Sequence, residues 1–167
     1  MEQISLTTPI PTGAWTLYFH SPGEKKWTPE TFHKLETVTT VGNFLTVIDT
    51  LDESKWSRGM YFWMRGAIPP LWENFQNIRG GSYSICQGTK DSIDIFHRYT
   101  LACMFEMATV KEDLIQGITI SPKKGFHVIK IWNRDASLYN KSGGLYLIDP
   151  RVQNNEIRYS PHVEKKM

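Results

Sequence analysis

Two neighbouring stretches decide the fold of this chain: Gln116-Gly117-Ile118-Thr119-Ile120 and Phe126-His127-Val128-Ile129-Lys130-Ile131-Trp132. Both are short and rich in β-branched and aromatic residues, a composition typical of strands. The segment between them, Ser121-Pro122-Lys123-Lys124-Gly125, has the proline and glycine of a tight connection. Strands joined so closely pair as an antiparallel hairpin. We therefore expect an antiparallel sheet that grows outward from this hairpin.

Outside the hairpin the sequence predicts further strands and two helices. Strand-like segments occupy residues 14–20, 35–39, 60–64, 83–86 and 156–159. Thr40 can cap a helix with apolar residues at helical spacing, and Asp91 or Ser92 can cap a longer helix that runs to about Val110. On that second helix, Phe96, Thr100, Cys103 and Met107 form one stripe. The predicted fold class is α+β, an antiparallel sheet with helices packed on one face.

Length and composition set the outer limits. At 167 residues the chain matches one domain, with an extended lead-in at 1–13, the domain at 14–160 and a flexible tail at 161–167. Because no apolar run is long enough to span a membrane and no secretory signal opens the chain, we expect a soluble intracellular protein. Cys86 and Cys103 lack metal-ligand spacing and are expected to be reduced core residues.

The long segment at residues 66–81 contains the pair Trp72-Glu73. Loops of this length in compact domains usually serve a function. An irregular loop lets both side chains turn toward one ligand, so the indole can stack on a planar base while the carboxylate accepts two parallel hydrogen bonds. Among the bases, guanine presents two adjacent donors. A role in the core is the alternative for the tryptophan.

Two further features are candidates for ligand contacts. Trp27 stands in a polar loop after Lys25-Lys26 and has no amphipathic pattern that would bury it, which favours contact with a ligand or a partner. Residues 121–134 contain four basic residues and no acidic one, while the whole chain carries a net charge of +2. This concentration of positive charge suits an anion site, although a solvated hairpin tip would explain it equally well.

Several motifs, in order along nearly the whole chain, resemble one known family. They are Trp15-Thr16-Leu17-Tyr18-Phe19, Lys26-Trp27, Thr40-Val41-Gly42-Asn43-Phe44, Pro70-Leu71-Trp72-Glu73 followed by Arg79-Gly80-Gly81, and Ile129-Lys130-Ile131-Trp132. The chain thereby resembles the eukaryotic translation initiation factor 4E family, which binds the 7-methylguanosine cap of mRNA. The resemblance implies a curved antiparallel β-sheet with helices on its convex face and the cap in its concave face.

The resemblance also implies roles for individual residues. The cap base would be bound by Trp27, Trp72, Glu73 and Trp132. The cap phosphates would be bound by Lys123, Lys124, Lys130 and His127. A scaffold protein of the initiation-factor 4G type, or a 4E-binding regulator, would contact the convex face at Val41, Leu45, Arg98 and Tyr99. The expected ligand is capped mRNA, with no catalytic residue, metal or cofactor, and the expected location is the cytoplasm, with the nucleus as a second compartment.

This chain departs from the family pattern at several of these positions. Ser82 stands where an arginine usually helps to bind phosphate, and Tyr83 where a tryptophan is usual. On the convex face Leu45 replaces a tryptophan, and Arg98 and Tyr99 replace a leucine and a glutamate. These differences predict weaker phosphate binding and a diverged partner contact, as in a specialised paralogue.

Two rival functions are compatible with parts of the sequence. The chain could be an interaction protein that has kept the fold and acts through its convex helical face, with weak cap binding or none. It could also be an enzyme on nucleotides with Glu73 as a general base and His97 or His127 assisting. The sequence contains no phosphate-cradling loop, dinucleotide-binding glycine motif, metal-ligand cluster or nucleophile elbow, which argues against the enzyme.

Overall fold

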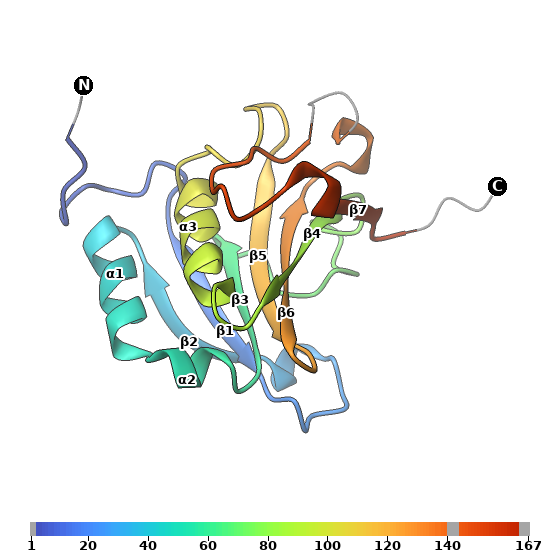
Figure 1. Cartoon of the computed structure of the whole chain (residues 1–167), viewed down its shortest axis with the longest axis horizontal. Coiled ribbons are helices and arrows are strands. Elements are labelled where there is room, and N and C mark those ends of the chain that lie inside the picture. The colour runs from blue at the N-terminus through green and yellow to red at the C-terminus, as the bar shows by residue number, and fades with distance from the viewer. Residues whose placement is uncertain (1–2, 140–143, 164–167) are drawn as a thin grey trace.

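The structure, a computed structural model, describes residues 3–139 and 144–163. Within these residues one sheet of seven strands has the order β2-β1-β3-β5-β6-β4-β7, and all neighbours are antiparallel (Figure 1). The strands are β1 (Trp15–His20), β2 (His33–Val38), β3 (Met60–Arg65), β4 (Gly81–Gly88), β5 (Ile115–Pro122), β6 (Phe126–Asn133) and β7 (Arg158–Pro161). The helices are α1 (Val41–Thr50), α2 (Glu53–Trp56) and α3 (Ser92–Met104). Single 3-10 turns occupy Pro29–Thr31, Ala136–Leu138 and Asn154–Glu156.

The hairpin of β5 and β6 lies inside the sheet, as its sequence predicts. Ile118 pairs with Ile131 and Ile120 with Ile129, so four buried isoleucines face the same layer. Because β5 pairs on its other side with β3 and β6 with β4, the hairpin is flanked by strands on both sides. This position explains why seven of the eight residues of β5 are buried.

The helices cover one face of the sheet, which confirms the α+β class. Figure 1 shows α1 and α3 lying across the same face of the curved sheet. The side-chain oxygen of Thr40 accepts a hydrogen bond from the backbone of Asn43 at 3.1 Å, so Thr40 caps α1 as expected. Alternate strand residues point toward these helices and form the main core with them. This core includes Trp15, Leu17, Trp63 and Ile131 of the strands and Phe96 of α3. The intervening strand residues point to the opposite, concave face.

Helix α3 is shorter than its sequence predicts. It ends at Met104 instead of continuing to about Val110, because Glu106 adopts a left-handed backbone with φ of 56°. Met107 therefore lies beyond the helix and is 62% exposed, so it does not extend the apolar stripe. The periodic pattern gave no sign of this stop, since no glycine or proline marks it.

Two further residues differ from what the sequence around them indicates. Trp56 stands among the polar residues of the segment 52–59, which is typical of a loop, but it ends the short helix α2 and is 1% exposed, with its indole N–H donating to the carbonyl of Leu51. Cys103 is buried as expected, but Cys86 is exposed. Cys86 lies near the end of β4, where the apolar alternation stops.

The residues before β1 lie against the fold. Ile10 is buried and donates its backbone N–H to Thr39, and Pro9 forms an isolated bridge with Thr40. At the other end of the chain, β7 extends to Pro161, which pairs with Gly81. Residues 164–167 of the tail lie outside the described residues. The boundaries at 1–13, 14–160 and 161–167 stay a prediction.

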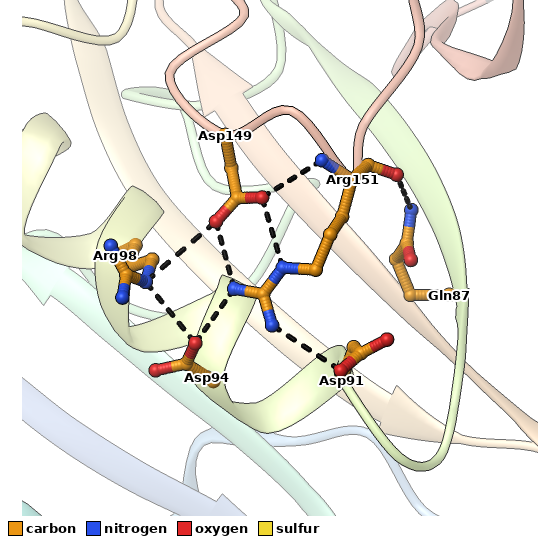
Figure 2. A network of polar contacts seen from close by, with 6 residues as sticks. All are labelled: Gln87, Asp91, Asp94, Arg98, Asp149 and Arg151. Carbon is orange, nitrogen blue, oxygen red and sulfur yellow. Dashed lines mark hydrogen bonds and ion pairs between the residues drawn. The ribbon is translucent and has the colours of Figure 1, made fainter.

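A polar network ties the segment after β6 to α3 (Figure 2). The guanidinium of Arg151 contacts the carboxylates of Asp149, Asp94 and Asp91 at 2.6 to 3.3 Å. Arg98 on α3 reaches Asp94 at 3.1 Å and Asp149 at 3.7 Å. Asp149 is nearly buried with only 4% of its side chain exposed, so its charge depends on these partners.

We expect Asp149→Asn to lower the free energy of unfolding at pH 7 by about 2 kcal/mol, because hydrogen bonds to a charged group typically contribute that much. The hydrogen bonds from Arg151 lower the pKa of Asp149 to about 2, against roughly 3.9 in an unfolded chain. The contribution is therefore complete above about pH 4 and is lost as the pH falls toward 2. The difference in unfolding free energy between wild type and variant, measured by urea unfolding, should be smaller at pH 3 than at pH 7.

The exposed Asp49 on α1 supplies a matched control, because it has the same charge outside the network. Asp49→Asn should change the unfolding free energy little at either pH. If the difference in unfolding free energy between wild type and Asp149→Asn were the same at both pH values, the assigned role of the Asp149 carboxylate would be contradicted.

Candidate functional site

A pocket of about 410 Å³ opens on the concave face of the sheet. It brings together six residues that the sequence singled out from distant segments: Trp27, Trp72, Glu73, Lys123, Lys130 and Trp132. A larger hollow of about 760 Å³ beside Arg79 and Arg134 contains none of these six. The smaller pocket is therefore the candidate site, because the chemistry converges there.

The floor of the pocket belongs to a second, smaller apolar cluster, made mostly of strand residues. Phe62 and Met64 of β3, Trp132 of β6 and Phe32 pack together and are almost fully buried. Phe32 meets Phe62 edge to face at 5.2 Å, and Phe62 meets Trp132 in the same way at 6.2 Å. These residues alternate with the ones that face the helices. This part of the concave face is therefore apolar and closely packed. In many antiparallel sheets the face opposite the helices is instead polar and exposed to solvent.

Trp27 forms one wall of the pocket from the loop between β1 and β2. Its side chain is 48% exposed, in agreement with the absence of any burying pattern around it. The imidazole of His20 lies parallel to the indole, with ring centroids 3.8 Å apart, and is itself buried. The tryptophan therefore has one face packed against the protein.

Trp72 and Glu73 form the other wall from the loop between β3 and β4. Trp72 is 48% exposed and Glu73 is exposed, so both are available to a ligand. The loop is held by Asn77, which is fully buried and donates from its amide to the carbonyls of Pro69 at 3.0 Å and Leu71 at 2.9 Å. The long loop is thus fixed by its own polar contacts.

Two glycines bring this loop into the sheet. A Cβ on Gly80 would lie 1.8 Å from the carbonyl oxygen of Asn133, and one on Gly81 would lie 2.4 Å from that of Ser160. Only glycine permits such close backbone approach. The pair following Arg79 is accordingly explained by the junction of the loop with β4, next to β6 and β7.

His162 lies beside two of the tryptophans that line the pocket, and sequence reasoning missed it. Its backbone N–H donates to Gly80, and its Nδ1 donates to the carbonyl of Asn77 at 2.8 Å. The ring lies 5.3 Å from Trp132 and 6.2 Å from Trp72. Burial lowers the pKa of His162. Its position in a short polar tail gave no signal of this contact.

The structure corrects part of the expected phosphate site. His127 does not line the pocket: it is 3% exposed on the helix-facing side of β6 and bonds through Nδ1 to the hydroxyl of Ser92. The reason is strand alternation, which places residue 127 on the same side as Ile129. Burial lowers the pKa of His127, which favours its neutral form. Lys123 and Lys130 line the pocket and Lys124 does not.

The expected partner contact on the convex face is also corrected. Tyr99 is fully buried, and its hydroxyl donates to the carbonyl of Tyr146 at 2.8 Å. Val41 is 5% exposed, beneath a lead-in that bonds to its backbone through Thr8. Leu45 and Arg98 are exposed. Tyr99 is therefore covered near Tyr146 and Val41 by the lead-in, so two of the four residues on which the prediction relied are not accessible.

Among residues 3–139 and 144–163 no group of three or more His, Cys, Asp or Glu side chains could hold a metal ion. In the same part of the chain, no helix has the length and apolar character needed to cross a membrane.

Comparison with known proteins identifies the family. The model of the family described as eukaryotic initiation factor 4E matches residues 12–165, nearly the whole chain. The chain belongs to this family. It is 26% identical over 158 residues to eukaryotic translation initiation factor 4E-2 of Schizosaccharomyces pombe, covering 89% of this chain and 65% of the relative. For translation initiation factor 4E of Saccharomyces cerevisiae the identity is again 26%, with 89% and 74% covered. The chain thus spans about two thirds of the length of the fission yeast relative.

Solved structures of the same family share the fold. The structure of C. elegans eIF4E-3 with the 4E-binding protein Mextli and a cap analog superposes with a TM-score of 0.73 at 18% identity, covering 93% of this chain and 92% of that one. The structure of Ascaris suum eIF4E-3 with the m7G cap gives 0.70 at 18% identity, with 96% and 94% covered. This likeness confirms the curved sheet with helices on its convex face.

Proposed function

We propose that this chain binds the 7-methylguanosine cap of mRNA, without catalysis, by stacking the base between Trp27 and Trp72 while Glu73 reads it as guanine. The observation that carries the proposal is the convergence of these three side chains on one pocket of about 410 Å³ with an apolar floor. That volume suits a single purine base with part of its phosphate chain, since small-ligand pockets begin at roughly 300 Å³.

Two half-exposed indoles explain why methylation would be recognised. Methylation at N7 places a positive charge on the guanine ring, and a desolvated cation over an indole face gains on the order of 1–2 kcal/mol. A neutral guanine would retain stacking but not this electrostatic term. The buried Trp132 at the floor adds a further apolar surface beside the ring.

Glu73 would supply the identity of the base. An ionised carboxylate only accepts hydrogen bonds, and guanine offers it two adjacent donors at N1 and N2. Adenine presents an acceptor at N1 and would set two lone pairs against each other, an arrangement that a polar site rejects strongly.

Lys130 and Lys123 would bind the phosphates. Lys130 lies on the concave side of β6, between Thr119 of β5 and Ser84 of β4. Around these lysines the pocket presents Thr119 and Ser121. Ser82 is buried in the sheet. Few cations therefore contact the phosphates, and the dependence of binding on salt should be shallow.

The relatives support a role in translation. Those reported above are named as translation initiation factors, and solved neighbours are named as complexes with a cap or with a 4E-binding protein. We infer that this chain acts in translation initiation or its regulation in the cytoplasm, with a scaffold or regulator as partner. The burial of Tyr99 and Val41 supports a diverged contact with that partner.

Titration of tryptophan fluorescence tests the proposal. We expect strong quenching by 7-methyl-GTP, because the ligand covers Trp27 and Trp72, and much weaker quenching by GTP at equal concentration. Titrations at about 50 and 200 mM salt should show affinity falling only modestly, as one or two lysine contacts imply.

The two ligands control for one another, since they differ only by the methyl group and its charge. Equal quenching by both ligands would show that the pocket binds nucleotides without recognising the methyl group, which would contradict a cap-specific site. Absence of quenching by either would overturn the proposal and favour the partner-binding alternative.

A further inference from the structure

Trp27 is held from behind by a residue that has been given no role in ligand binding. We infer that His20 is a positioning residue for the cap: it fixes the plane of Trp27 so that the free face of the indole points into the pocket. This inference rests on the proposed function. It names a residue outside the pocket lining that controls one wall of the site.

The first support is the stacking geometry. The rings of His20 and Trp27 are parallel, with an interplanar angle of 0° and centroids 3.8 Å apart. Since His20 is 1% exposed and Trp27 is 48% exposed, the stack has a buried side and an open side. Phe32 meets the two rings at tilted angles, 4.9 Å from His20 and 5.9 Å from Trp27, and closes the edge of the stack.

The second support is a hydrogen bond to the backbone next to Trp27. The Nε2 atom of His20 lies 2.9 Å from the carbonyl oxygen of Lys26. A carbonyl can only accept, so Nε2 carries the hydrogen and donates it. The imidazole therefore restrains both the ring of Trp27 and the peptide that leads into it.

Strand register places the histidine there. His20 is the last residue of β1, paired with Met60, and it follows Thr16 and Tyr18 on the concave side of the strand. Through this histidine, strand β1 restrains the loop that carries Trp27. A half-exposed indole without this backing would sample several rotamers, and ordering it on binding would reduce affinity.

Two substitutions of His20 distinguish the effect of a flat ring from the effect of filling the buried site. Phenylalanine keeps a flat face and fills the site, whereas leucine fills the site without a flat face. We expect His20→Leu to raise the Kd for 7-methyl-GTP by about tenfold, and His20→Phe by no more than about threefold. The near-ultraviolet circular dichroism of the free protein should change in His20→Leu and be largely restored in His20→Phe.

A second histidine against a tryptophan provides the control. His97 on α3 meets Trp56 edge to face at 4.8 Å, away from the pocket. His97→Leu removes a comparable ring and should leave the Kd within about twofold of wild type. Thermal unfolding of all three variants establishes that they remain folded at the titration temperature.

The outcomes distinguish this inference from the proposed function. If wild-type protein fails to bind 7-methyl-GTP, the proposed function fails. If wild type binds and His20→Leu binds equally well, only the positioning role is overturned. A folded His20→Phe variant as weak as His20→Leu would overturn the stacking of the two rings as the cause, because phenylalanine keeps the flat face.

Discussion

Trp72→Ala should reduce affinity for 7-methyl-GTP by about 100-fold and abolish retention on a cap-analogue resin. The substitution removes one of the two aromatic faces, and loss of base stacking typically costs about 1–3 kcal/mol per base, to which the cation–π attraction of the methylated ring adds. Folding should not suffer, because the indole is half exposed on a loop whose backbone is held by Asn77. Resin retention and isothermal titration of wild type and variant measure the effect, with circular dichroism to verify the fold.

The same loop offers a matched control in Phe75. This aromatic side chain is 81% exposed three positions further on and does not line the pocket. Phe75→Ala should bind 7-methyl-GTP as wild type does. Retention of Trp72→Ala on the resin at wild-type level would refute the stacking role of Trp72.

Glu73→Gln should weaken 7-methyl-GTP binding by about 10- to 100-fold, as expected for loss of hydrogen bonds to a charged group worth about 1.5–3 kcal/mol. The amide keeps one acceptor and adds a donor that faces a guanine donor. Discrimination against 7-methyl-ITP, which lacks the exocyclic amino group, should shrink in the variant. Competition of both ligands against fluorescent cap analogue measures the ratio of affinities.

Glu112 serves as the control for charge, because it is an exposed glutamate beside the neighbouring hollow at Arg79. Glu112→Gln should leave both affinities unchanged. If Glu73→Gln lowered the affinity for both ligands equally, the carboxylate would act through net charge and would not read the base.

Local sequence patterns predicted most of the fold. The spacing of apolar residues on β1, β3, β5 and β6 determines which side chains meet the helices, and the structure follows it. The errors occur where a tertiary contact overrides a local pattern. The stop of α3 is followed by a left-handed Glu106 that no glycine or proline announces, and Trp56 is buried against Phe96 of α3, forty residues away.

The candidate site was predictable where its chemistry stands out in the sequence. Trp27 lies in a polar loop with no pattern that would bury it, Trp72-Glu73 lies in a long irregular loop, and the structure gathers them in one pocket. Trp132 of the floor was predicted, whereas Phe62 and His20 were missed because each also reads as an ordinary strand residue. The prediction that His127 binds phosphate was wrong because its side chain lies on the helix-facing side of β6. Along a strand, a shift of one residue moves a side chain to the opposite face.

The buried amide of Asn77 has a consequence for the thermodynamics of binding. Because its two hydrogen bonds fix the backbone of the Trp72 loop in the free protein, much of the conformational entropy of that loop is already lost on folding. A ligand that enters the pocket then orders few additional dihedral angles, so more of its stacking energy remains as affinity. Binding by such a preorganised wall should have a small entropic penalty and a heat capacity change set mainly by the apolar surface that the base covers.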